Sequence, residues 1–279
     1  MTVPEAPAPE PVAPPPYGYL PYEPVPLPPP PVPPRRRRVW LALLAAWALV
    51  LLGTGIWYSW HGRPSWRDQT TIASARPTVD LAITEVVRAA GTSAVPAISG
   101  FEKVADCDVT PARGGATYHR IVWLYAAVGA EPALLDRIAA GLPHGYGARA
   151  QHSTGGAVHT LAADAGNYVT LTGILTVPGL VTITADTGCR PVGQAPPVDP
   201  SAAPPANPLG ITGTWRAHAL PCGLRTVEVT GPAARPLTSL PSAQAVVSSA
   251  DAYADRAGVA AHTDAGAVTM SVTTGTCDS

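Results

Sequence analysis

The sequence predicts a disordered proline-rich tail, one transmembrane helix, and an outer α+β region followed by a small, mostly-β unit. Three observations carry this prediction: prolines crowd residues 4–34, an uncharged apolar run spans residues 39–60, and all four cysteines follow that run. Proline fixes φ and lacks a backbone donor, so a tail of this composition cannot build helices or sheet ladders. We therefore expect residues 1–34 to be disordered with polyproline II character.

The apolar run at residues 39–60 has the length of a membrane-spanning helix. At about 1.5 Å per residue such a run spans roughly 33 Å, close to the thickness of the hydrocarbon core. A cleaved signal peptide has a shorter apolar core, about 7–15 residues, before a small-residue cleavage site. Gly53 and Gly55 are the only candidates for such a site, and the run continues beyond them to Trp60. We predict an uncleaved signal-anchor that contacts the lipid bilayer.

Clustered positive charge predicts the orientation of this helix. Directly before the apolar run lie Arg35, Arg36, Arg37 and Arg38. The two arginines after the run are spaced apart and are offset in part by an aspartate. Because clustered arginines stay on the cytoplasmic side, we expect a single-pass protein of the cell membrane with a cytoplasmic N-terminus. Residues beyond about 61 are then extracytoplasmic.

The cysteine pattern predicts disulfides. The four cysteines are Cys107, Cys189, Cys222 and Cys277, all on the predicted outer side. An even number in an oxidising compartment favours disulfides over metal or redox chemistry. Three connectivities are open, and a Pro/Ala-rich stretch at residues 191–208 favours Cys107–Cys189 with Cys222–Cys277, one bridge on each side of it.

The changes in composition divide the chain into seven segments. In chain order they are a cytoplasmic tail (1–34), a basic stop (35–38), the transmembrane helix (39–60), a juxtamembrane stretch (61–75), an outer α+β domain (76–190), a Pro/Ala-rich linker (191–210) and a small β-rich domain (211–279). The last domain is small enough to depend on its disulfide for stability.

Periodicity predicts the elements of the first outer domain. The segment at residues 77–91 carries a one-sided apolar stripe, with Thr78 as N-cap and Gly91 at its end, and a second helix is expected over 131–143. Strands are expected near 98–106, 118–127, 145–151, 157–163, 168–174 and 179–189. This pattern favours a helical layer on a mostly antiparallel sheet.

The second outer domain is predicted to be mostly strand, with one short helix around residues 249–256. Asp164-Ala165-Gly166 and Asp264-Ala265-Gly266 each lie between alternating strands, as hairpin turns do. The two domains also end alike, in a Thr-rich strand followed by Gly and Cys. An internal duplication and a shared turn chemistry both explain these matches, and the sequence leaves the two open.

In the segment at residues 118–127, Ile121, Trp123 and Tyr125 share one face and Val122 and Leu124 the other. Both faces are apolar, which favours a central strand under a helix over a carbohydrate-binding platform.

The sequence contains no complete catalytic motif. The nearest hydrolase-like set combines Ser153 and His152 with His119, His159 and Asp164, but adjacent residues on a strand point to opposite faces. The histidines show no i, i+4 pairing on a helix, so no metal and no cofactor are predicted. Acidic and basic residues are balanced beyond residue 60 without a basic stripe, which argues against nucleic-acid binding.

The layout of the chain, with its T-G-C-R-P (187–191) and T-T-G-T-C (273–277) endings, resembles uncharacterised actinobacterial single-pass envelope proteins. This resemblance implies a location in the cell envelope and brings no activity with it. Peptides in the tail match recognition forms: Pro14 to Tyr17 fits a WW ligand, and Pro30, Pro33 and Arg35 fit an SH3 ligand. In so proline-rich a segment a spacer role is the simpler interpretation.

These observations favour a non-enzymatic, membrane-anchored extracytoplasmic module that binds an envelope protein or ligand. One alternative is an envelope hydrolase that uses His119, His152, Ser153 and Asp164. Another is a single-pass sensor or scaffold whose proline-rich tail recruits a cytoplasmic partner.

Overall fold

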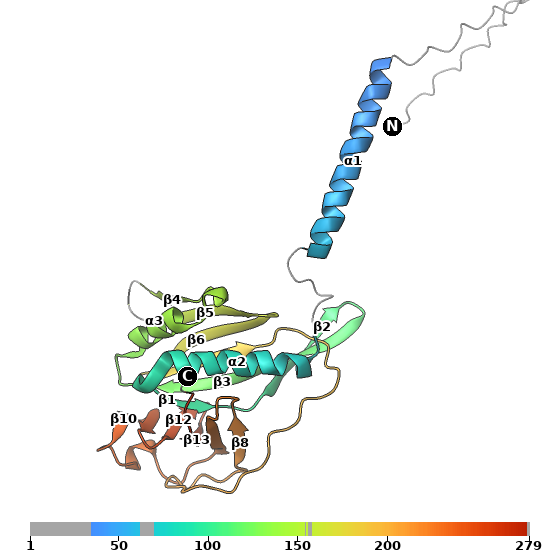
Figure 1. Ribbon diagram of the computed structural model, residues 1–279. Coiled ribbons are helices and arrows are strands. Elements are labelled where there is room, and N and C mark those ends of the chain that lie inside the picture. The colour runs from blue at the N-terminus through green and yellow to red at the C-terminus, as the bar shows by residue number, and fades with distance from the viewer. Residues whose placement is uncertain (1–34, 62–69, 154, 156–157, 278–279) are drawn as a thin grey trace, which may run out of the picture. The chain divides into compact units, whose positions relative to one another are not determined.

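The computed structural model describes residues 35–61, 70–153, 155 and 158–277. The chain forms two compact units, Met1–Gly62 and Arg63–Ser279. Helix α1 (Arg35–His61) is the described element of the first unit, and all other described elements belong to the second (Figure 1). The predicted disorder of the tail at residues 1–34 lies outside the described residues.

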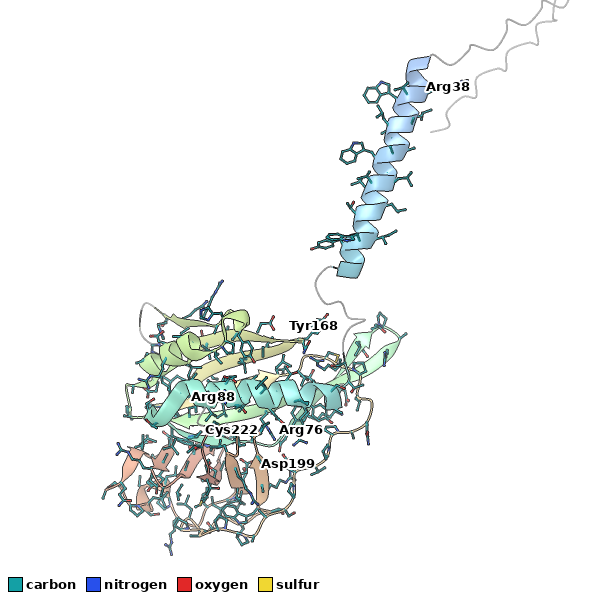
Figure 2. The ribbon with its side chains drawn as sticks, in the orientation of Figure 1. Arg38, Arg76, Arg88, Tyr168, Asp199 and Cys222 are labelled. Atoms are coloured by element: carbon teal, nitrogen blue, oxygen red, sulfur yellow. A yellow bond between two sulfur atoms is a disulfide. The ribbon has the colours of Figure 1, made fainter. Side chains whose placement is uncertain are left out.

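Helix α1 is apolar on all sides. Large exposed side chains follow its whole length, from Val39 to Tyr58. The window Arg38–Tyr58 is 21 residues long with a mean hydropathy of 2.2, which makes α1 the one described helix long and apolar enough to cross a membrane. Its Thr54 hydroxyl donates to the carbonyl of Val50 at 2.6 Å, so this polar group is satisfied within the helix. Arg38 lies near the start of α1, at its basic end (Figure 2).

Helix α2 (Ile72–Ala90) begins earlier than its predicted cap at Thr78. That prediction was wrong because Ile72 and Ala75 are buried, and the Ile72 amide donates to the carbonyl of Pro191 at 3.2 Å. Packing thus extends the helix through Pro77 by more than one turn, into the segment expected to be juxtamembrane. Its other end was predicted correctly: Gly91 has φ of 62° and its amide donates to Val87.

The first sheet is antiparallel and carries both helices of the second unit on one face (Figure 1). Its strands are β1 (Val95–Ile98), β2 (Glu102–Thr110), β3 (Arg113–Tyr125), β4 (Arg149–His152), β5 (His159–Gly166), β6 (Val169–Val177) and β7 (Leu180–Asp186). They lie in the order β1-β3-β7-β6-β5-β4, and β2 also pairs with β3. Helix α3 (Glu131–Gly141) packs beside α2. The expected helical layer on an antiparallel sheet is confirmed.

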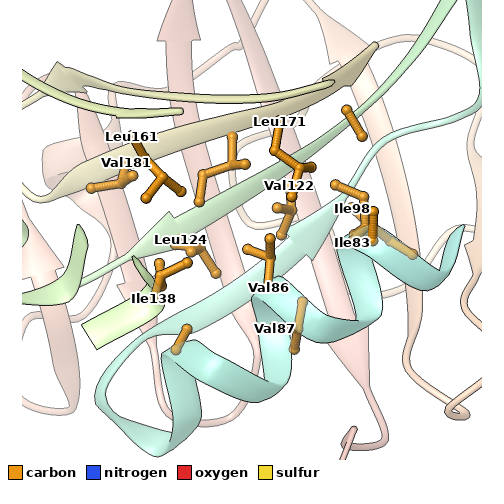
Figure 3. Packing of buried hydrophobic residues seen from close by; sticks show 14 of the residues in the cluster. Ile83, Val86, Val87, Ile98, Val122, Leu124, Ile138, Leu161, Leu171 and Val181 are labelled. Atoms are coloured by element: carbon orange, nitrogen blue, oxygen red, sulfur yellow. The ribbon is translucent and has the colours of Figure 1, made fainter. Parts of the chain in front are cut away.

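The main core fills the space between this sheet and the two helices (Figure 3). Ile83 and Val86 of α2 face Val122 and Leu124 of β3, and all four side chains are fully buried. Burying one such side chain stabilises the fold by about 1.5–3 kcal/mol before the entropy cost of ordering it. The apolar stripe recognised in the sequence is therefore the face that holds α2 on the sheet.

The second sheet is also antiparallel, in the order β10-β11-β12-β13-β9-β8. Its strands are β8 (Arg216–Ala219), β9 (Arg225–Gly231), β10 (Ala245–Ser248), β11 (Ala252–Asp255), β12 (Val259–Asp264) and β13 (Ala267–Thr274). The helix predicted around residues 249–256 is replaced by β11. Antiparallel pairing with β10 on one side and β12 on the other holds this segment extended, with Tyr253 buried and its hydroxyl donating to the carbonyl of Pro241 at 3.0 Å.

The second sheet packs on the face of the first sheet that the helices leave free. Trp123 and Tyr125 of β3 meet small residues of β11 and β12, including Ala252 and Ala260. The Tyr125 hydroxyl lies 2.8 Å from Nδ1 of His262, and burial lowers the pKa of His262 to about 4, so that imidazole is neutral. Strand β3 is thus central as expected, but one of its faces lies under a sheet.

The segment at residues 191–210, expected to be a linker, runs without helix or regular strand but is held at several points. Ser201 forms an isolated bridge with Arg216, and Leu209 is fully buried in the second core. The stretches expected as separate domains, 76–190 and 211–279, accordingly form one compact unit.

Two tight hairpins occur near the predicted turns. Asp264 pairs with Ala267 across Ala265 and Gly266, and both of these central residues have positive φ, the type I′ geometry. In the other hairpin Gly166 pairs with Val169, so the turn lies just after the predicted Asp164-Ala165-Gly166. Alternating strands with a glycine between them were enough to place both hairpins.

Both disulfides favoured by the sequence are present. Cys107 and Cys189 have Cα atoms 6.0 Å apart, and Cys222 and Cys277 have Cα atoms 4.9 Å apart. Cys277 is 5% exposed and belongs, with Leu220 and Leu224, to the core under α2. The second disulfide therefore joins the β8–β9 turn to the end of β13, where both segments pack in the core under α2.

We expect removal of the Cys222–Cys277 bridge to destabilise the protein more than removal of Cys107–Cys189. The chain-entropy contributions are similar, about 4 kcal/mol each, for sequence separations of 55 and 82. Cys277 lies in a core, with Cys222 packed against it, so C222S/C277S also places one buried hydroxyl among apolar side chains, at a further cost of about 1–3 kcal/mol. Urea unfolding of the two double variants measures the difference, and equal losses would contradict this account.

Candidate functional site

A groove of about 760 Å³ lies in the described part of the second unit. One wall comes from the end of α2, the turn after it and the start of β1. The other comes from the turn between β11 and β12 and the end of β13. Its lining residues are Val87, Arg88, Gly91, Thr92, Ala94, Val95, Pro96, Leu224, Arg256, Ala257, Gly258, Thr273, Thr274, Gly275, Thr276 and Cys277. The groove therefore exists only because the two sheets are packed together.

The charged side chains that line the groove are both cationic. Arg88 reaches from α2, where its Nε donates to the carbonyl of Cys277 at 3.3 Å and its Nη1 pairs with Glu85 at 2.6 Å. Arg256 is exposed in the β11–β12 turn. None of the lining residues is acidic. Guanidinium groups beside threonine hydroxyls and a partly apolar floor suit a ligand with a carboxylate or phosphate group.

Two glycines let the backbone segments of the groove wall approach closely. A Cβ on Gly258 would lie 2.2 Å from the carbonyl oxygen of Thr273, and one on Gly275 would lie 2.4 Å from that of Gly223. Both glycines also have positive φ, which side chains disfavour. The wall is thus shaped by backbone contact and by the disulfide at Cys277.

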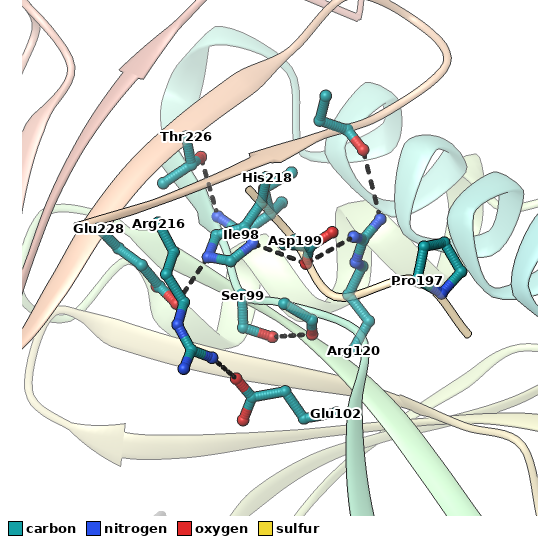
Figure 4. Close-up of polar contacts among 12 residues, drawn as sticks. Ile98, Ser99, Glu102, Arg120, Pro197, Asp199, Arg216, His218, Thr226 and Glu228 are labelled. Atoms are coloured by element: carbon teal, nitrogen blue, oxygen red, sulfur yellow. Dashed lines mark hydrogen bonds and ion pairs between the residues drawn. The ribbon is translucent and has the colours of Figure 1, made fainter. Parts of the chain in front are cut away.

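A second polar feature, the Asp199 cluster, fastens the segment between the two sheets (Figure 4). We use this name for Arg76, Asp80, Arg120, Asp199, His218 and Glu228. Asp199 Oδ1 accepts from Arg76 at 3.0 Å, and its Oδ2 lies 2.9 Å from Nδ1 of His218. On its other side the His218 ring lies 2.9 Å from Glu228 Oε1. Asp199 thus links helix α2 to strand β8.

Arg120 is fully buried in this cluster, with no exposed side-chain surface. Its Nη1 lies 2.5 Å from Asp80 Oδ1, and its Nη2 lies 3.9 Å from Asp199 Oδ2. Its Nε and Nη2 make no hydrogen bond with the described residues. The guanidinium depends on these two carboxylates, since an unpaired buried charge costs several kcal/mol.

The cluster shifts the pKa values of its members. Burial alone would lower the pKa of His218, but hydrogen bonds to Asp199 and Glu228 and the charges of both carboxylates raise it to about 9. Burial would likewise raise the pKa of Asp199, yet His218, Arg120 and Arg76 lower it to about 2. Burial raises the pKa of Asp80 despite the neighbouring arginines. At neutral pH the pair between Asp199 and His218 is therefore ionic.

Of the hydrolase-like residues named from the sequence, the structure brings His152 and His159 together and leaves His119 and Asp164 apart. His119 on β3 pairs with Asp186 of β7, while Asp164 lies on β5, three strands away or about 14 Å. Ser153 accepts a hydrogen bond from the Val158 amide at 3.0 Å, as a hairpin-loop serine does. His152 contacts His159 and Asp136 instead. These residues form no nucleophile–base pair.

Sequence reasoning missed the groove and the Asp199 cluster. Both depend on contacts between residues more than a hundred positions apart, such as Arg76 with Asp199 and Arg88 with Cys277. One signal was present: Asp199 is the single charged residue in an otherwise uncharged Pro/Ala-rich stretch at residues 191–208. Among the described residues, no three His, Cys, Asp or Glu side chains converge on one point as metal ligands.

Comparison with known proteins finds no protein family, curated protein or solved structure that matches this chain.

We expect the free energy of unfolding to fall at alkaline pH, because His218 loses its proton there. A raised folded-state pKa means that the contribution of His218 is complete below about pH 6.5 and is lost as pH rises through about 9. The shift corresponds to a loss on the order of 3 kcal/mol. Asp199 acts oppositely: its contribution is present above about pH 4 and disappears as pH falls through about 2.

Urea unfolding of wild type and H218Q between pH 7 and 9.5 tests this. The variant is expected to be less stable at pH 7 and to depend much less on pH. If both proteins lose stability in parallel across this range, His218 is not the titrating group.

Proposed function

We propose that this chain is a single-pass membrane protein whose second unit lies outside the cytoplasm and binds an anionic ligand of the cell envelope. The observation that carries the proposal is the groove, where Arg88 and Arg256 are the charged lining residues and no lining residue is acidic. A concave surface with a few polar groups among apolar ones is the usual form of a ligand site. Because the charged residues that line the groove are positive, the ligand is expected to be an anion.

The location is supported by the order of features along the chain. The apolar helix precedes the disulfide-bonded unit, and the arginine cluster precedes the helix. Disulfides persist in oxidising compartments, and clustered arginines stay in the cytoplasm. Together these favour a signal-anchor with residues 1–34 inside and the groove outside.

Binding rather than catalysis is favoured because the groove lining contains no histidine and no carboxylate that would serve as a general base. Its nucleophile-type side chains are threonines, and Cys277 is committed to a disulfide. The chemistry on offer is charge pairing and hydrogen bonding. These hold a ligand without transforming it.

We expect an alkaline phosphatase fusion at the C-terminus to be active and one at the N-terminus to be inactive. Alkaline phosphatase needs disulfides and therefore reports the oxidising side. Replacing Arg35 to Arg38 by glutamine should increase the fraction of chains in the opposite orientation. An active N-terminal fusion, or a mature protein that starts near residue 60, would contradict the anchor and its direction.

We expect the double variant R88Q/R256Q to lose anion binding. The matched control is R113Q/R235Q, which removes the same charge from exposed positions outside the groove lining. Calorimetric titration of the full chain in detergent uses phosphate, succinate and a short peptide with a free carboxylate. Wild type and control are expected to bind at least one of them, with affinity at least about tenfold above that of R88Q/R256Q, a difference of about 1.4 kcal/mol. Equal affinities in the two variants would remove the groove from consideration.

A further inference from the structure

Two histidines face each other across the β4–β5 hairpin, away from the groove. His152 and His159 are directly opposite in the strand register. The next pair is hydrogen-bonded, since the Ser153 amide donates to the Val158 carbonyl at 2.9 Å. His152 and His159 therefore occupy a non-hydrogen-bonded position, where side chains lie closest. Their Nδ1 atoms are 2.8 Å apart.

A carboxylate from a third element orients one of these rings. Nε2 of His152 lies 3.0 Å from Oδ1 of Asp136 on α3. A hydrogen on Nε2 leaves the Nδ1 lone pair of neutral His152 directed toward His159. This is the arrangement of metal-ligating histidines, which give one ring nitrogen to the metal and donate from the other to a carboxylate.

The pair is also open to solvent. The His152 side chain is 32% exposed and the Asp136 side chain is 62% exposed. A hydrated cation can therefore reach the two nitrogens while keeping several of its waters. Imidazole nitrogen suits zinc, nickel and copper, whereas magnesium and calcium prefer oxygen ligands.

We propose that His152 and His159 form a surface site for a divalent transition-metal ion, with both Nδ1 atoms as ligands and Asp136 as the group that orients His152. Zinc–nitrogen bonds of about 2.0–2.1 Å in tetrahedral geometry place two ligand nitrogens roughly 3.3 Å apart. From 2.8 Å, the two rings need to separate by only about half an ångström. The hydrogen shared by the two Nδ1 atoms then moves to Nε2 of His159, and water completes the coordination. This site is independent of the proposed anion groove.

Calorimetric titration of the tag-free full chain with zinc chloride at pH 7.5 tests the proposal. We expect one zinc ion per chain, with H152A and H159A each lowering the affinity at least about tenfold. D136A should lower it by about tenfold through loss of orientation. The matched control is H119A, because His119 lies on β3, separated from β5 by β7 and β6.

Zinc affinity that is unchanged in H152A and H159A, or the absence of saturable binding by wild type, would overturn the proposal. Because a variant can fail for reasons of folding, the wild-type chain supplies a second readout. Imidazole resonances in long-range proton–nitrogen spectra should shift for His152 and His159 on zinc addition, and not for His119. Shifts confined to other histidines would also refute the site.

Discussion

The structure of the second unit depends on one strand that is apolar on both faces. Val122 and Leu124 of β3 hold the two helices, while Trp123 and Tyr125 hold the second sheet. Successive side chains of a strand point to opposite faces of its sheet, so a central β3 presents apolar side chains both to the helices and to the second sheet. The groove follows from this arrangement, because its two walls belong to structures that β3 brings together. A change that detached the second sheet would expose the underside of β3 and remove the groove at once.

The Asp199 cluster also holds the two sheets together, through charge pairing and hydrogen bonds rather than apolar contact. Apolar contact between the sheets is not directional, whereas the contacts of Asp199 with Arg76 and His218 fix where the connecting segment lies. Burying these charges is costly and is offset only while every partner is in place. The cluster therefore fixes the position in which the connecting segment docks. Asp199 and His218 are both charged at neutral pH, since the pKa of Asp199 is about 2 and that of His218 is about 9.

The elements of the fold were largely predictable because their signals are local. The stripe at Val79, Ile83 and Val86 and the alternation in β3 survive in the structure, as do both hairpins. The start of α2 was missed because contact with Pro191 outweighs the local capping preference of Thr78. The segment of β11 was wrongly predicted to be helical, because Ala252, Tyr253 and Ala254 show neither the alternation of a strand nor the 3.6-residue period of a helix. The correct disulfides followed from the sequence, although the two expected domains share one compact unit.

The candidate site was less predictable, because it is made of distant contacts. No sequence pattern marks Arg88 as a site residue. It lines the groove because the fold brings Cys277, whose carbonyl accepts from Arg88 Nε, next to it. The histidine pair shows the same limit: a search for i, i+4 spacing finds ligands on helices, whereas His152 and His159 meet through strand register. Charged residues in an otherwise apolar or proline-rich stretch, such as Asp199, are the one local hint that a contact of this kind exists.

The central claim is that an anion binds between the two sheets, and hydrogen–deuterium exchange tests it most directly. The full chain in detergent is compared with and without a saturating concentration of whichever test anion binds it. Slower exchange is predicted in three separated stretches that line the groove: 91–96, 256–258 and 273–277. Protection confined to other parts of the described chain, or no protection under saturation, would contradict the account.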